Sequence, residues 1–277
     1  MRPINKKIIH LYNAKLKEIS VFYKEEIVFT NFGKTNVLIL GDNKKPPLFL
    51  IHGLNSGAPF AIDTVSILLK KYQIFAIDIL GQPNKSDFVR LNKKDASYGK
   101  WLLEIITNFK ADSYTLCGIS FGAFPILKSL LINETKVKEV FLISPASIVN
   151  GSLLKTISRY LLPMQKFKKT KNIVYLEKSL SSYHNEFDDL EIQFTKEVFL
   201  NFKMDFSLTP NFKTKQLATI KTPITIITSK NDYFVPAKRL KKKSEKSFLS
   251  LKNFVVLKDS KHIASKEILK NCFEKLD

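Results

Sequence analysis

The stretch YTLCGISFGAFPIL, from Tyr114 to Leu127, joins a strand-like run, a Gly-x-Ser-x-Gly pentapeptide and an apolar, helix-like run. A short motif of this kind can arise by chance, so its weight depends on its context. Here Ser120 stands where a strand ends and a helix begins, as a nucleophile elbow requires. Side chains at Gly118 and Gly122 would collide with the tight turn or with a neighbouring strand. We therefore interpret Ser120 as a candidate nucleophile, with a buried serine in an ordinary turn as the alternative.

Around this stretch, strand-like runs alternate with helix-like runs, which predicts an α/β fold. The first two strands read as a hairpin turning at Gly33, and the run PPLFLIHG (46–53) is apolar throughout, like a strand buried on both faces. The strand-like runs are missing from about Ser147 to Thr214, which indicates an insertion. An insertion of this kind is commonly a lid or binding element. We predict a mostly parallel, doubly wound sheet whose core spans 1–146 and 213–277, with a helical cap inserted at 147–212.

The chain has 277 residues, of which 44% are hydrophobic, and this suits one large domain with an insertion. No apolar run approaches the roughly 20 residues that span a bilayer. The N-terminus resembles an amphipathic helix, with Ile4, Ile8 and Leu11 in its apolar stripe, and not a signal peptide. Cys117 and Cys272 do not form a disulfide framework. Together these features predict a reduced, cytoplasmic location.

The formal net charge of +20 could mark a nucleic-acid binder, because clustered basic side chains neutralise phosphates. The basic runs at 165–171 and 237–246 belong to no recognisable nucleic-acid module, and nearly all basic residues are lysines. Arginine usually performs the bidentate reading of bases. We expect a solvated basic surface and no nucleic-acid partner, because a charge run is a weak signal by itself.

A serine hydroxyl needs a base before it becomes a good nucleophile. Of the four histidines, only His262 follows the last predicted strand, which gives the chain order serine, acid, histidine. His10 lies in the predicted N-terminal helix and His184 in the insertion. His52 ends a buried strand and is interpreted as a residue that shapes the following loop. His262 is therefore the candidate base.

The base needs a carboxylate that fixes its tautomer. Asp232 ends the strand-like run TPITIITSKND (222–232) and stands at a loop on the carboxyl edge of the sheet. Asp259 lies on the approach to His262 and Asp205 lies in the insertion, so both are poorer candidates. An oxyanion hole also needs two donors. We expect the backbone N–H groups of Phe121, after the nucleophile, and of Leu54, in the loop after an earlier strand.

The segments that carry the pattern follow in chain order as LIHGLNSG, AIDILGQPNKS, LCGISFGAFPIL, ISPA, ITSKNDYFVP and DSKHI. On these motifs the sequence resembles the α/β-hydrolase superfamily from about Glu25 to the C-terminus, and it looks most like bacterial carboxylesterases of the single-domain, capped type. The resemblance implies the same triad and oxyanion donors: Ser120, Asp232, His262, Leu54 and Phe121. It also implies that Asp78 organises its loop without reacting. Where the family pattern has glycine before the last histidine, this sequence has Lys261.

Relatives that use an aspartate nucleophile, the haloalkane dehalogenases and epoxide hydrolases, are excluded by Ser120. No zinc-ligand spacing occurs, and we expect neither a metal nor a cofactor. The expected chemistry is two-step acyl transfer on small or medium hydrophobic esters, by a monomer or a homodimer. A thioesterase, a carbon–carbon bond hydrolase and a catalytically silent binding protein remain open, because the same fold and triad fit each of them.

Overall fold

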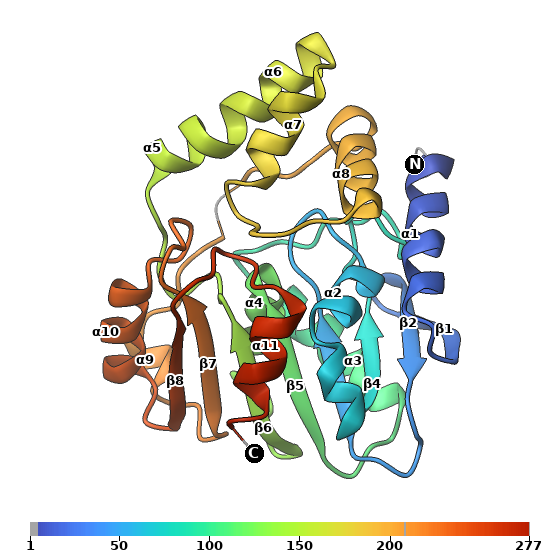
Figure 1. The fold of residues 1–277 in the computed structure, drawn as a ribbon. Coiled ribbons are helices and arrows are strands. Elements are labelled where there is room, and N and C mark those ends of the chain that lie inside the picture. Colours follow the sequence, from blue (N-terminus) through green and yellow to red (C-terminus); the bar gives the residue numbers. More distant parts are fainter. Residues whose placement is uncertain (1–4, 208, 277) are drawn as a thin grey trace.

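The computed structural model describes residues 5–207 and 209–276 as one sheet with helices on both faces (Figure 1). The described part of the chain forms an eight-stranded sheet in the order β1-β2-β4-β3-β5-β6-β7-β8. The strands are β1 (Tyr23–Thr30), β2 (Gly33–Leu40), β3 (Pro47–Ile51), β4 (Gln73–Ile77), β5 (Tyr114–Ile119), β6 (Val137–Ile143), β7 (Ile224–Ser229) and β8 (Leu251–Leu257). This strand order and the mostly parallel pairing confirm the predicted fold class, the α/β-hydrolase fold.

The predicted hairpin is confirmed, because β1 and β2 pair antiparallel and Thr30 faces Gly33 across the turn. Strand β2 also runs antiparallel to β4, whereas all later pairings are parallel. The carboxyl ends of β3 to β8 therefore meet at one edge of the sheet. Strands β5 and β7 are buried along their whole length, as expected for parallel strands covered on both faces.

Eleven helices accompany the sheet in the described residues: α1 (Lys6–Glu18), α2 (Ala58–Thr64), α3 (Ser97–Asn108), α4 (Ala123–Leu130), α5 (Leu153–Thr156), α6 (Leu162–Thr170), α7 (Ile173–Leu180), α8 (Asp189–Asn201), α9 (Thr214–Leu217), α10 (Ala237–Ser247) and α11 (Lys266–Phe273). Helices α1, α2 and α11 share one apolar core, and α3, α4 and α10 share the other. The sheet separates these two cores, so each of its faces is covered.

Helices α5 to α8, yellow-green to orange in Figure 1, lie above the carboxyl edge of the sheet. A π-helical stretch at Ile157–Leu161 joins α5 to α6. The predicted ends of the insertion meet, because the Phe212 N–H donates to the Ser147 carbonyl at 2.8 Å. Phe194 of α8 packs on Phe60 of α2 with ring centroids 4.3 Å apart. The chain thus leaves the sheet and returns to it at one place, and the helical segment is packed against the core.

Helix α1 forms the predicted amphipathic element, with Ile8 and Leu11 buried, while Ile4 lies outside the described residues. Its Lys15 is only 1% exposed, and its ammonium pairs with the carboxylate of Asp63 on α2 at 2.8 Å. The same ammonium contacts Asp188, directly before α8. One buried cation therefore ties the N-terminal helix to both the core and the segment above the sheet.

Candidate active site

Ser120 occupies a strained turn between β5 and α4. Its φ is +52°, in the left-handed region, which costs a non-glycine residue about 1–2 kcal/mol. A Cβ on Gly122 would lie 2.2 Å from the carbonyl oxygen of Ile51, and one on Gly118 would lie 2.8 Å from the backbone of Gly122. Both distances are too short for real contacts, so the turn packs this closely on β5 and on the end of β3 only because these two positions are glycines.

The strand register brings three distant side chains to the carboxyl edge of the sheet. His262 Nε2 lies 2.8 Å from Ser120 Oγ, and His262 Nδ1 lies 2.7 Å from Asp232 Oδ2. A carboxylate only accepts, so Nδ1 carries the hydrogen and Nε2 is left to accept the serine hydroxyl. The second oxygen of Asp232 accepts the N–H groups of Phe234 and Val235 at 2.8 and 2.9 Å. Asp232 is therefore held rigidly behind the imidazole.

The two weaker acid candidates lie elsewhere. Asp259 is exposed, and its carbonyl oxygen accepts the Asn185 side-chain amide at 2.6 Å. Asp205 pairs with Lys93 at 2.8 Å, which contributes to lowering the pKa of Asp205 to about 2 against the opposing effect of burial. Of the three acid candidates, Asp232 is the one whose carboxylate contacts the His262 ring.

The two expected oxyanion donors flank Ser120. Phe121 follows it in a 3₁₀ turn at Ser120–Gly122 that leads into α4. A Cβ on Gly53 would lie 3.5 Å from the Ser120 Cβ, so the loop that continues to Leu54 passes beside the serine. That loop is fixed by Asn55, which has a φ of +56° and donates its N–H to Gln82 Oε1 at 2.8 Å.

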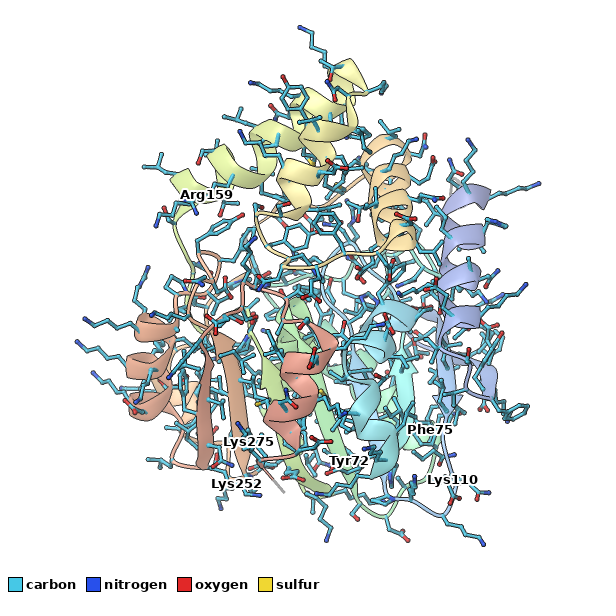
Figure 2. All side chains as sticks on the ribbon, viewed as in Figure 1. Tyr72, Phe75, Lys110, Arg159, Lys252 and Lys275 are labelled. Carbon is cyan, nitrogen blue, oxygen red and sulfur yellow. The ribbon has the colours of Figure 1, made fainter. Side chains whose placement is uncertain are left out.

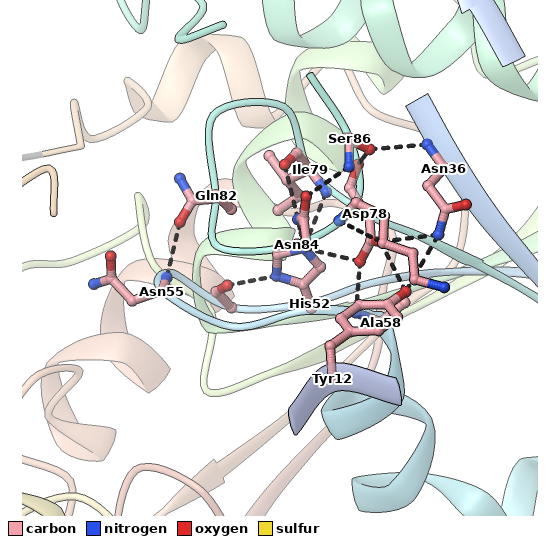
Figure 3. Close-up of polar contacts among 12 residues, drawn as sticks. Tyr12, Asn36, His52, Asn55, Ala58, Asp78, Ile79, Gln82, Asn84 and Ser86 are labelled. Carbon is pink, nitrogen blue, oxygen red and sulfur yellow. Dashed lines mark hydrogen bonds and ion pairs between the residues drawn. The ribbon is translucent and has the colours of Figure 1, made fainter. Parts of the chain in front are cut away.

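His52 holds the base of this loop (Figure 3). Its Nδ1–H donates to the Gly53 carbonyl at 2.7 Å, and its Nε2 accepts the N–H of Ile79 at 2.9 Å. The Asn84 amide lies 3.1 Å from the same nitrogen. Burial lowers the pKa of His52 to about 4, so the ring is neutral near pH 7. Both ring nitrogens are occupied, which agrees with the structural role expected for His52.

Asp78 is the centre of the neighbouring network (Figure 3). Its carboxylate accepts from the Tyr12 hydroxyl at 2.8 Å, the Asn36 amide at 3.0 Å and the Ala58 N–H at 2.8 Å. Burial raises the pKa of Asp78 to about 6, and these hydrogen bonds oppose that rise. Tyr12 comes from α1, so the N-terminal helix takes part in the network. The sequence carries no signal for this contact, which spans 66 positions.

A cavity of about 440 Å³ opens above Ser120 and His262, between the sheet edge and the helical segment. Leu54 also lines it. Most of the other lining side chains are apolar or aromatic, and the larger ones include Phe60, Leu153, Tyr160, Leu161, Leu180, Tyr183, Phe187, Phe194, Val198, Phe199, Phe206 and Phe234. Such a lining suits an apolar organic group held beside the serine.

Sequence reasoning assigned no contact in or beside this cavity to three polar residues, Glu191, His184 and Lys261. Glu191 of α8 lines it together with His184, which was noted only as a histidine of the insertion. Lys261 donates from Nζ to the carbonyl of Ser181 at 2.6 Å and to that of His184 at 3.3 Å. The lysine that replaces the family's glycine thus binds the loop of His262 to the turn between α7 and α8.

Apart from the buried Lys15, basic side chains are spread over the outside of the described part of the chain. Lys110, Lys252 and Lys275 are exposed at the end of the sheet opposite the cavity (Figure 2). Among residues 5–207 and 209–276, no helix is long and apolar enough to cross a membrane. The same residues contain no group of three or more His, Cys, Asp or Glu side chains arranged to hold a metal ion.

The strand order, the elbow turn and the inserted helices define a protein of the α/β-hydrolase fold. The chain is similar to bacterial carboxylesterases. It is 30% identical over 135 residues to the uncharacterized carboxylesterase Nap of Bacillus subtilis, and 26% identical over 141 residues to carboxylesterase YbfK of the same organism. These matches cover 49% and 50% of the chain, and they span about half of each relative, 45% and 48%. No family model matches the chain.

Solved structures extend the likeness in fold to nearly the whole chain. The naproxen esterase (carboxylesterase NP) of Bacillus subtilis superposes with a TM-score of 0.84 at 20% identity, covering 100% of this chain and 98% of that one. Carboxylesterase CesB (YbfK) of the same organism gives 0.80 at 16% identity, covering 98% and 97%. Both cover the helical segment as well as the core.

Proposed function

We propose that the protein is a serine hydrolase that cleaves carboxylic esters of small to medium hydrophobic substrates. The observation that carries the proposal is the unbroken hydrogen-bonded chain from Ser120 through His262 to Asp232 at the floor of an apolar cavity. The similarity to two Bacillus carboxylesterases supports the ester as substrate.

In the proposed mechanism, His262 Nε2 takes the Ser120 proton while Oγ attacks the ester carbonyl. Asp232 stabilises the resulting imidazolium through Nδ1. The backbone N–H groups of Phe121 and Leu54 bind the oxyanion. His262 then protonates the leaving alcohol, and water, activated by the same ring, cleaves the acyl-enzyme and restores Ser120.

We propose that residues 147–212 act as a cap over the substrate. The cavity lining drawn from α5, the π-helical stretch, α7 and α8 supports this, since those side chains would cover any group bound at Ser120. We also propose a cytoplasmic location, supported by two cysteines that are both free and buried. The partner is then a small-molecule ester rather than a nucleic acid.

A fluorophosphonate probe tests the proposal directly. Labelling should fall on Ser120 and should be lost in Ser120→Ala and in His262→Ala. Folded protein that is not labelled would contradict the proposal and favour a silent binding protein. A series of p-nitrophenyl esters of rising chain length, run beside matched thioesters and a carbon–carbon hydrolase substrate, then separates the three hydrolase chemistries. Faster turnover of thioesters or of the carbon–carbon substrate would overturn the ester assignment.

A further inference from the structure

A second polar group faces the cavity from the helical segment. His184 lies in the turn between α7 and α8, and Glu191 lies in the first turn of α8. Both line the cavity that contains Ser120 and His262. Glu191 Oε1 is 3.9 Å from His184 Nε2, and the two side chains keep 21% and 14% of their surface exposed. They are therefore accessible to a bound molecule.

His184 offers an acceptor to the cavity. Its Nδ1 contacts the carbonyl oxygen of Glu186, which can only accept, so Nδ1 carries the ring hydrogen. Nε2 then presents its lone pair toward Glu191. Burial is the main cause that lowers the pKa of His184 to about 4, and the ring is neutral near pH 7.

Glu191 offers a second acceptor. Its Oε2 accepts the N–H of Asp188 at 3.1 Å in a capping box, which leaves Oε1 facing His184. Burial, reinforced by the Asp188 carboxylate, raises the pKa of Glu191 to about 7. A carboxylate in an apolar cavity is stabilised by a cation that approaches it closely.

The charged side chains that line the cavity in the described residues are both acidic. Although the chain has 45 lysines and arginines, none is among the described residues that line the cavity. The two carboxylic acids in the lining are Glu191 and Asp205. Asp205 is already paired with Lys93. Lys15, whose charge opposes the rise in the pKa of Glu191, is bound to Asp63 and Asp188 outside the lining. Of the two carboxylates in the lining, Glu191 is therefore the one that can bind a cationic ligand.

We propose that Glu191 and His184 form a subsite for an ammonium group, so that the preferred substrates are esters whose apolar chain ends in a primary amine. An ammonium has several N–H hydrogens and can donate to both acceptors at once, whereas an alcohol has a single hydrogen. Its positive charge also offsets the Glu191 carboxylate in the cavity, where the attraction is weakly screened. This inference rests on the proposed esterase function for the reaction itself, but not for the binding of the amine.

The kinetic test compares p-nitrophenyl esters of 6-aminohexanoate and 8-aminooctanoate with isosteres in which a methyl or a hydroxyl replaces the ammonium. We expect kcat/KM to favour the amino ester at one chain length. Glu191→Gln should reduce this preference about 10-fold, a typical effect of losing a charge-assisted bond, while the methyl ester changes less than about 2-fold. Glutamine can still accept from Asp188, so the capping box is kept. Glu177→Gln, at an exposed position of α7, is the matched control for the change in net charge.

Binding provides a readout that does not depend on turnover. In Ser120→Ala, calorimetry should find hexylammonium bound more tightly than 1-hexanol, and Glu191→Gln should abolish the difference. The proposal is overturned if neither ligand nor substrate shows a preference for the amine, if the hydroxyl analogue is preferred, or if both glutamine variants change the ratio equally. Binding of hexylammonium without any esterase activity would instead refute the proposed reaction and leave the subsite standing.

Discussion

Replacing Lys261 tests whether the turn between α7 and α8 positions His262. Lys261 Nζ donates to the carbonyls of Ser181 and His184, and Ser181 is the C-cap of α7, where a cation is favoured by the helix dipole. Its backbone N–H donates to Asn185 Oδ1 at 3.1 Å. On the other side of the base, the Ile263 N–H donates to the carbonyl of Tyr183 at 2.9 Å. His262 is therefore flanked on both sides by bonds to one turn.

The Lys261→Met substitution removes the two ammonium bonds and keeps the backbone ones. A hydrogen bond from a charged group stabilises by about 1.5–3 kcal/mol, and partial exposure of Lys261 places the loss near the lower limit. If the loss of about 1.5 kcal/mol misaligns His262 and raises the activation barrier by the same amount, kcat decreases about 10-fold. If the loss affects only the stability of the fold, Tm decreases by roughly 3 °C and kcat is unchanged.

Steady-state kinetics on p-nitrophenyl butyrate, the rate of fluorophosphonate labelling and Tm separate these outcomes. We expect kcat and the labelling rate to decrease together, with KM nearly constant and with recovery in Lys261→Arg, which keeps a cationic donor. Lys258→Met, at an exposed position three residues earlier, should leave all values within about 2-fold. A lower Tm with unchanged labelling and kcat would refute a positioning role for Lys261.

Three further outcomes are expected. The pKa of Glu191 in the folded protein, about 7, exceeds its ordinary value of 4.5, so its contribution to stability is full below pH 4.5 and is lost as the pH rises through 7. Between pH 4.5 and pH 8, the unfolding free energy of Glu191→Gln, measured in urea, should therefore rise by up to about 3 kcal/mol relative to that of the unsubstituted protein. A difference that stays constant with pH would contradict this. Gly122→Ala forces a Cβ against the Ile51 carbonyl and should cost on the order of 3 kcal/mol, visible as a lower Tm or insoluble protein. Tyr12→Phe removes a buried donor from Asp78 and should cost about 1–3 kcal/mol in the same unfolding assay, whereas an unchanged midpoint would show that the bond contributes nothing.

The sequence predicted the fold and the candidate triad because both follow from local patterns and one topological rule. Apolar runs identify β3, β5 and β7 as buried parallel strands. The carboxyl ends of parallel strands share an edge, so residues just after three strands meet there. Ser120, Asp232 and His262 follow the parallel strands β5, β7 and β8, although 142 positions separate the first from the last. Side-chain detail was not required for that inference.

The remaining contacts could not be predicted because they depend on how the helical segment docks on the core. Lys261 and Ser181 are 80 positions apart and belong to no periodic pattern. The spacing of Asp188 and Glu191 is typical of a capping box and indicates a helix start, but it does not tell which way Oε1 points. Only the three-dimensional packing of α8 beside α1 and α2 places Glu191 at the cavity with Oε1 toward His184.

The turn between α7 and α8 contacts both the loop of the proposed base, His262, and the proposed ammonium subsite. Its backbone carbonyls bind the loop of His262, and its side chain at His184 faces the cavity beside Glu191. A displacement of this turn would move the base and the proposed subsite together, so variants that loosen the turn should alter kcat and substrate preference at once. Variants confined to the Glu191 carboxylate should alter preference alone. The segment above the sheet would then do more than cover the substrate, because it would link what is bound to how well His262 is aligned.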